Sequence, residues 1–377
     1  MSDASASKSS LRSFLLSGQG WPYLLVPFIA IAIVLDQIGA DPIIVFFSSA
    51  LGVVPTAALM GRATEELAHR AGPGIGGLLN VTFGNAPELI IALFALNAGL
   101  QEVVKASIIG SILGNLLLVM GAAMLIGGWG RERQKFVAEA ASAQATMLLL
   151  ATVALLLPAM FLLSHGGELP QLEEEATNYP SDIEHMSFAV AIVLLLSYFA
   201  GLWFSLRTHH DVFNPDSEDD TPEDAWSTKR SVLVLAGAGI AVGVMSEILV
   251  GSIEEASEGI GLSPFFVSLI IVAIVGNAAE HWVAVYFAAR DKMDIAIAIA
   301  IGSSAQIALF VMPVLVLLSF VLGPFPLSLE FSGLEIGAVL LAVLIAAHVS
   351  QDGESTWFEG VQLLAVYVVV GIVFYFV

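Results

Sequence analysis

The stretch GNAPE at residues 84–88 recurs 192 residues later as GNAAE at residues 276–280. The same offset aligns Gly110-Ser111 with Gly302-Ser303. Both copies lie inside long apolar runs, where Asn and Glu are scarce, so a shared membrane-like composition does not readily account for the match. The chain therefore contains an internal repeat, and its spacing organises the whole sequence.

The composition is that of a polytopic membrane protein. Of the 377 residues, 57% are hydrophobic and 12% are charged, whereas a soluble domain has about 45–50% apolar and about 25% charged residues. The net charge of −21 argues against a nucleic-acid partner, because phosphate binding requires basic clusters. The absence of cysteine excludes disulfides, thiolate metal sites and cysteine nucleophiles.

The apolar runs are long enough for helices that cross a bilayer and lack the strict alternation of barrel strands. They predict an all-α membrane protein with eleven transmembrane helices and no cleavable signal peptide. The predicted spans cover residues 22–38, 42–60, 74–98, 103–127, 140–164, 185–206, 230–251, 262–288, 293–320, 333–349 and 358–377.

The basic residues predict the orientation of these spans. Positive charge is retained on the cytoplasmic side of a membrane, and a cytoplasmic N-terminus puts every Lys and Arg except Lys105 on that side. We therefore expect an integral, multi-pass protein of the plasma (inner) membrane, with its C-terminus outside. The cytoplasmic bases are Lys8, Arg12, Arg62, Arg70, Arg131, Arg133, Lys135, Arg207, Lys229, Arg230, Arg290 and Lys292.

The two motif copies fall in the third and eighth predicted spans, which run in opposite directions. This pattern predicts one N-terminal helix followed by two inverted five-helix repeats, an arrangement typical of secondary transporters. The predicted parts are the tail and first helix (1–40), the first repeat (41–206), an acidic cytoplasmic linker (207–229) and the second repeat (230–377). The linker lacks the spacing of an EF-hand loop, so a charged linker is favoured over a calcium sensor.

The repeated glutamates, Glu88 and Glu280, are the strongest functional candidates. A carboxylate near the bilayer centre costs about 2.5–3.5 kcal/mol on insertion scales, so a pair related by a repeat is hard to explain as structural. Two carboxylates that face each other repel, and either a bound cation or protons relieve the repulsion. A site that alternates between those two states exchanges a cation for protons.

The neighbouring residues extend this site. Asn85 precedes Glu88 by three positions and Asn277 precedes Glu280 likewise, so each pair shares a helix face. A donor set of oxygen atoms suits Ca²⁺, with Mn²⁺ and Cd²⁺ left open, whereas Zn²⁺ and Cu⁺ prefer nitrogen or sulfur. Candidates for the ion or proton path are Ser111, Asn115, Ser303, Gln306 and His281; for His281, packing or a plain hydrogen bond is an equal alternative, and the nearby glycines also fit ordinary close packing.

The two blocks that begin GNAPELIIALFALNAG and GNAAEHWVAVYFAARD resemble the paired repeats of the cation/Ca²⁺ exchanger superfamily, and are most similar to its cation/proton branch, the Ca²⁺/H⁺ antiporters. The resemblance implies that Glu88 and Glu280 form the Ca²⁺ site and exchange it for protons, with Asn85 and Asn277 in the same path. The rival sodium/calcium branch has hydroxyl-rich blocks, and here Asn replaces the hydroxyl pair in both halves.

These observations predict a secondary antiporter, not an enzyme, that has no cofactor. It lies in the lipid bilayer and moves Ca²⁺ and H⁺ across it. No Walker A, G-x-S-x-G or H-E-x-x-H motif is present in the sequence. Na⁺- or K⁺-coupled Ca²⁺ exchange is the main alternative, and a cation channel or a membrane sensor is a second one. A homo-oligomer is left open.

Overall fold

The computed structural model describes residues 20–170, 181–208 and 226–376. Most of the predicted linker and the N-terminal tail therefore lie outside the described residues. The first half contains η1 (Trp21–Leu25), α2 (Pro27–Gln37), α3 (Pro42–Gly84), α4 (Ala86–Asn97), α5 (Gln101–Leu113), η2 (Gly114–Val119), α6 (Met120–Gly128), β1 (Gln134–Lys135), α7 (Ala138–Ser164), α8 (Ser181–Trp203) and η3 (Phe204–Thr208).

The second half continues with α10 (Thr228–Ile260), α11 (Pro264–Val267), η4 (Ser268–Val272), α12 (Ala273–Ala289), α13 (Met293–Gln306), η5 (Ile307–Val311), α14 (Met312–Ser319), α15 (Gly333–Val349), β2 (Glu354–Ser355) and α16 (Trp357–Tyr375). The prediction that all regular structure is helical misses one feature: β1 and β2 form a short antiparallel pair. Strands of two residues carry too little alternation to be seen in a sequence.

Within the described residues, eight helical stretches are long and apolar enough to cross a membrane, and three apolar helices are shorter. The eight stretches are Pro42–Ala71, Gln101–Gly128, Ala138–Ser164, Asp182–Thr208, Thr228–Ile260, Pro264–Ala289, Met293–Ser319 and Trp357–Tyr375. The shorter helices are Trp21–Gln37, Ala86–Asn97 and Gly333–Val349.

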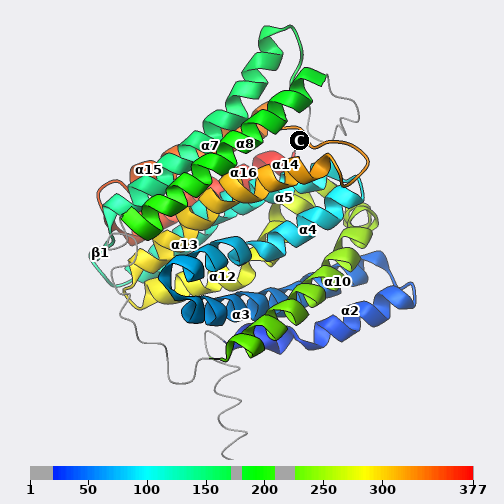
Figure 1. Cartoon of the computed structure of the whole chain (residues 1–377), viewed down its shortest axis with the longest axis horizontal. Helices are drawn as coiled ribbons and strands as arrows, with labels where there is room; N and C mark the ends of the chain where they lie inside the picture. The colour runs from blue at the N-terminus through cyan, green and yellow to red at the C-terminus, as the bar shows by residue number, and fades with distance from the viewer. Residues whose placement is uncertain (1–19, 171–180, 209–225, 377) are drawn as a thin grey trace, which may run out of the picture.

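The helices form a central group with flanking groups on both sides (Figure 1). Helices α7, α8 and α15 lie along one side and α2, α3 and α10 along the other, with α4, α5, α12 and α13 between them. In the apolar part of Gln101–Gly128, 83% of the residues are buried, whereas the share is 17% in the apolar parts of Asp182–Thr208 and Trp357–Tyr375. Apolar side chains on the outer helices thus face away from the protein, as they do in a lipid environment, and the polar side chains of α5 and α13 are carried by central helices.

The predicted third span, 74–98, is not one continuous helix. Helix α3 runs from Pro42 to Gly84, the chain breaks at Asn85, and α4 follows from Ala86. Pro87 explains the break, because it has no N–H to donate to the carbonyl of Phe83. Within α3 the chain also bends sharply: a Cβ on Gly76 would lie 2.3 Å from the carbonyl oxygen of Ala68, although a straight helix separates such residues by about 12 Å.

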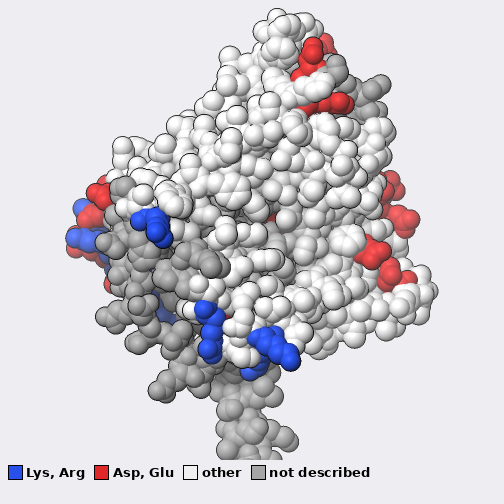
Figure 2. Space-filling model, viewed as in Figure 1, with Lys and Arg blue, Asp and Glu red and all other residues white. Residues whose placement is uncertain are grey.

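Charged side chains divide the surface into two sides. In Figure 2 the visible Lys and Arg side chains lie along the left and lower edges, whereas the upper and right edges show only Asp and Glu. We call the first the basic side, which carries Arg131, Arg133 and Lys135. There Arg131 pairs with Asp291, and Arg133 and Lys135 pair with Glu354.

Trp226, near the end of the predicted linker, is held against α3. Its backbone N–H donates to Glu66 Oε2 at 2.7 Å, and its carbonyl accepts from Arg70 Nε at 2.9 Å. The guanidinium groups of Arg62 and Arg230 lie 5.2 and 4.4 Å from the centre of the indole ring, distances typical of cation–π contacts. The start of α10 is thereby fastened to the middle of α3.

An irregular stretch, exposed in its first half and buried in its second half, connects α14 to α15 at the opposite side. We call Phe320–Ser332 the capping segment. Its residues Leu327–Ser332 are at most 5% exposed. Lys105 of α5 donates from Nζ to the carbonyl of Glu330 at 2.6 Å and to Ser328 Oγ at 3.4 Å. The only base that the sequence predicts outside is therefore bound to this segment.

Glu330 makes the stability of the folded protein depend on pH. Burial raises the pKa of its carboxyl above 4.5, and the Lys105 charge partly opposes this shift. An acid with a raised pKa binds its proton more tightly in the folded state, so it lowers stability as the pH rises through that pKa. Between about pH 5 and about pH 8, the melting temperature of detergent-solubilised wild type should fall more than that of Glu330→Gln. The exposed Glu258→Gln variant is the control, and parallel curves for wild type and Glu330→Gln would contradict the assignment.

Candidate ion-binding site

The two copies of the repeated motif meet in the centre of the molecule. Glu88 lies in the first turn of α4, and Glu280 lies in the middle of α12. A Cβ on Gly84 would lie 3.8 Å from Glu280 Oε1, and a Cβ on Gly276 would lie 3.7 Å from Glu88 Cγ. Each carboxylate side chain therefore packs over the glycine of the other copy, and the two charges interact directly.

The two asparagines are buried beside the carboxylates and use their amide nitrogens to join the two halves. Asn85 Nδ2 donates to Gln306 Oε1, and Asn277 Nδ2 donates to Ser111 Oγ at 3.1 Å and to the carbonyl of Ala273 at 2.9 Å. A backbone carbonyl only accepts, so the contact with Ala273 sets which way the Asn277 amide faces. The Oδ1 atoms of both asparagines are then left for another partner.

Three buried oxygen atoms at this site have no hydrogen-bond partner among the described residues. They are Asn85 Oδ1, Asn277 Oδ1 and Glu88 Oε2. Buried acceptors are almost always satisfied, because leaving one unpaired costs about 1–3 kcal/mol. Glu280 differs, since its Oε2 accepts from Ser303 Oγ at 3.0 Å. The unpaired oxygens are the atoms that a cation would satisfy.

His281 does not hydrogen-bond to Glu280 in the structure. Its Nε2 lies 3.0 Å from Asn115 Oδ1, and because an amide oxygen only accepts, Nε2 carries the proton that is donated. Asn115 itself is fully buried. This contact favours the plain hydrogen bond over a direct role for His281 at the carboxylate.

Two π-helices lie beside these polar residues, and the sequence analysis did not predict them. Asn115 lies in η2 (Gly114–Val119), and Gln306 immediately precedes η5 (Ile307–Val311). The offset of 192 residues maps one of these stretches onto the other. A π turn displaces side chains relative to a regular helix and is frequent at functional sites, so the two turns present Asn115 and Gln306 to the opposite half.

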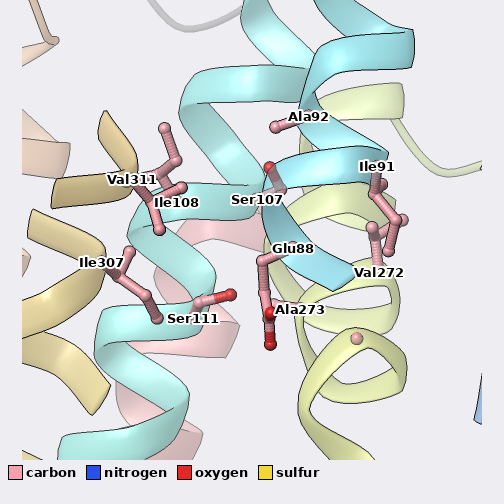
Figure 3. Close-up of a pocket in the computed structure, with 11 residues that line it drawn as sticks. Glu88, Ile91, Ala92, Ser107, Ile108, Ser111, Val272, Ala273, Ile307 and Val311 are labelled. Carbon is pink, nitrogen blue, oxygen red and sulfur yellow. The ribbon is translucent and has the colours of Figure 1, made fainter. Parts of the chain in front are cut away.

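A small cavity adjoins Glu88. Figure 3 shows the Glu88 side chain on α4, with Ser107 and Ser111 on the neighbouring helix α5. Of the predicted site residues, only Glu88 and Ser111 line it. Ser107 was not among the predicted path residues, although it precedes Ser111 by one helical turn. The remaining wall is apolar and includes Ile91, Ile108, Val272, Ile307 and Val311.

The donor set of the site fits a hard cation. Two carboxylates, two amide oxygens and two serine hydroxyls come together at this site. The described residues contain no cluster of three or more His, Cys, Asp or Glu side chains that could hold a metal ion. Oxygen ligands with flexible geometry suit Ca²⁺, whereas Zn²⁺ and Cu⁺ favour nitrogen and sulfur. A cation bound here would be cargo, with Glu88 and Glu280 as its charged ligands.

Comparison with known proteins identifies the family. The model of the sodium/calcium exchanger protein family matches residues 42–207 and 230–376. The chain belongs to this family. It is 42% identical to the Ca(2+)/H(+) antiporter of Aphanothece halophytica over 369 residues, which cover 93% of this chain and 95% of the relative.

Other family members support the cation/proton branch. The chain is 44% identical over 327 residues to the Ca(2+)/H(+) antiporter ChaA of Bacillus subtilis, covering 86% of this chain and 89% of the relative. The solved structure of native YfkE has a TM-score of 0.79 and 37% identity, and the match covers 94% of this chain and all of YfkE. The resemblance seen in the motif blocks is confirmed. The protein is an integral, multi-pass membrane protein of the sodium/calcium exchanger family.

Proposed function

We propose that this family member is a secondary antiporter that exchanges Ca²⁺ for H⁺ across a membrane. The observation that carries the proposal is the pair of central carboxylates, Glu88 and Glu280, each packed over the glycine of the other motif copy. The relatives named Ca(2+)/H(+) antiporter, similar over nearly their whole length, support the same substrates.

In this proposal Ca²⁺ and protons compete for one site. With Glu88 and Glu280 ionised, the two carboxylates and the carbonyl oxygens of Asn85 and Asn277 hold Ca²⁺. Protonation of both carboxylates removes the charges that bind the cation and relieves their mutual repulsion. Ser111 positions the Asn277 amide and Ser303 positions the Glu280 carboxylate.

We further propose that the site opens alternately to the two sides, through two inverted five-helix repeats and eleven spans in all. Support comes from the family model, which matches residues 42–207 and 230–376 separately, in close agreement with the predicted repeats 41–206 and 230–377. The equivalent positions of η2 and η5 support the same division. Residues 1–40 and the linker 207–229 then lie outside the repeats.

The basic side is proposed to face the cytoplasm of a plasma (inner) membrane, with the N-terminus inside and the C-terminus outside. The concentration of visible Lys and Arg on the left and lower edges in Figure 2 supports this orientation. The pairing of β1 with β2 adds support, because it joins two loops that the eleven-span topology puts on the same side.

Reconstitution into liposomes tests the coupling ion. A pH gradient should drive uptake of radiolabelled Ca²⁺, and an equal Na⁺ or K⁺ gradient at uniform pH should not. Collapse of the pH gradient with a protonophore is the control. Uptake driven by Na⁺ or K⁺ alone would replace the proton with that ion, and a flux that ignores every counter-ion gradient would indicate a channel.

A further inference from the structure

The cavity beside Glu88 points toward one end of the molecule. Along α4, Ile91 and Ala92 line the cavity. One turn after Ala92, Leu96 contacts the capping segment, since its carbonyl oxygen would lie 2.5 Å from a Cβ on Gly323. Along α5, Ser107 lines the cavity, close to the residues that bind the same segment. The cavity thus occupies the levels between Glu88 and the capping segment, and we call this end the cap side.

The capping segment has no regular structure, and side chains of the surrounding helices satisfy much of its buried backbone. Gln101 Nε2 donates to the carbonyls of Phe325 and Pro326 at 2.9 and 3.1 Å. The N–H of Leu327 donates to Ser319 Oγ, and the N–H of Leu329 donates to Ser187 Oγ. Buried backbone groups are paired in almost all proteins, and these hydrogen bonds help to hold the segment in position.

Lys105 is the charged tether among them. Its ammonium group donates to the capping segment at Glu330 and Ser328 and lies 5.4 Å from the centre of the Phe331 ring. The positive charge of Lys105 acts on two buried acids: Glu330 in the segment and Glu335 in the first turn of α15.

The charge balance makes this contact sensitive to Lys105. A buried carboxylate without a compensating cation is strongly unfavourable. Glu102, one turn before Lys105 on α5, adds a further acid to the same helix. The charge of Lys105 partly offsets both Glu330 and Glu335, and the N–H of Ser332 also donates to Glu335 Oε2 at 2.8 Å.

We propose that Lys105 is a positioning residue for transport: it holds the capping segment closed over the cavity, so that the cap side of the ion path opens only when this contact is released. The inference rests on the proposed antiport function, because a path with two gates has meaning only for a carrier. Helix α5 joins the two events, since it carries Lys105 at the closure and Ser107 and Ser111 at the cavity.

Thiol labelling tests the closure directly, because the chain has no cysteine. Ser107→Cys puts a reporter thiol in the cavity. Glu258 is exposed at the end of α10, so Glu258→Cys gives the labelling rate of a thiol that the capping segment does not shield. Both are studied in sealed membrane vesicles of known orientation, with a membrane-impermeant thiol reagent added at the cap side.

Adding Lys105→Met to Ser107→Cys should raise the labelling rate from the cap side about tenfold relative to the Glu258→Cys reference. Lys105→Arg keeps the charge and should keep the slow rate. If Lys105→Met fails to fold, the Lys105→Met/Glu330→Gln pair removes one charge from each partner and should show the same rise. An unchanged rate in a folded Lys105→Met or paired variant would overturn the proposal.

Ca²⁺/H⁺ exchange measured in the same vesicles separates this inference from the proposed function. Exchange by wild type together with labelling that does not depend on Lys105 overturns the closure and leaves the antiporter. Absence of exchange by folded wild type overturns the antiporter, and labelling that does depend on Lys105 would then keep the closure as a property of the fold.

Discussion

Replacing either Glu88 or Glu280 by Gln is expected to abolish pH-gradient-driven Ca²⁺ uptake in liposomes. Glutamine has nearly the same shape, so the packing over Gly276 or Gly84 is kept. The variant loses one of the two charges that bind the cation and a group that takes up a proton. Losing a buried charged ligand costs about 3 kcal/mol or more, which lowers uptake by at least about a hundredfold.

The matched control is Glu258→Gln, because that carboxylate is exposed at the end of α10. It should transport at the wild-type rate. Both site variants should also elute as folded protein, with melting temperatures at or above that of wild type, since a neutral side chain removes the repulsion between the carboxylates. Full uptake by either site variant would refute the paired-glutamate site.

The second large effect is expected from Gly110→Ala, which should destabilise the protein and stop transport. A Cβ on Gly110 would lie 2.0 Å from the carbonyl oxygen of Leu269 and 2.9 Å from the Cβ of Ala273. The carbonyl of Leu269 belongs to the backbone and cannot rotate away as a side chain can. The helices α5 and η4 must therefore move apart to admit the added methyl group. Overpacking of this kind typically costs about 1–3 kcal/mol, and the shift also moves Ser111 away from Asn277.

Gly302→Ala is the matched control, because Gly302 is the counterpart of Gly110 at the same offset. A Cβ there would meet the end of a flexible side chain, Gln144 Nε2, at 3.3 Å. Thermal unfolding in detergent and Ca²⁺ uptake should show a small effect for Gly302→Ala and a severe one for Gly110→Ala. Equal effects of the two changes would mean that the close approach at Leu269 does not limit the fold.

The central pair of glutamates was predictable from sequence because polar residues are expensive in an apolar run. Asn and Glu stand out there, and their recurrence at one offset predicted that the two motifs belong to one site. The structure brings Glu88 and Glu280 together. Hydropathy likewise predicted most helical stretches, since a bilayer-length apolar run has few other structures open to it.

The hydrogen-bond partners could not be predicted, because they depend on how the two halves pack. Nothing local to Asn85 indicates Gln306 as its partner, and nothing local to His281 indicates Asn115. The π-helices η2 and η5 have no sequence signature. The partners of Lys105 could not be predicted for a related reason: they lie in an irregular segment whose burial is set by tertiary structure alone.

The break at Asn85 has a consequence for the energy balance of a carrier. A duplicated carrier with perfect symmetry would have two resting orientations of equal energy, because exchanging the halves interconverts them. Here α4 begins next to Glu88, whose charge the positive end of the helix dipole favours, whereas α12 continues unbroken past Glu280, which has a serine hydroxyl instead. For the proposed carrier, we therefore expect the two orientations to be unequal in energy, with the idle protein mainly in one of them.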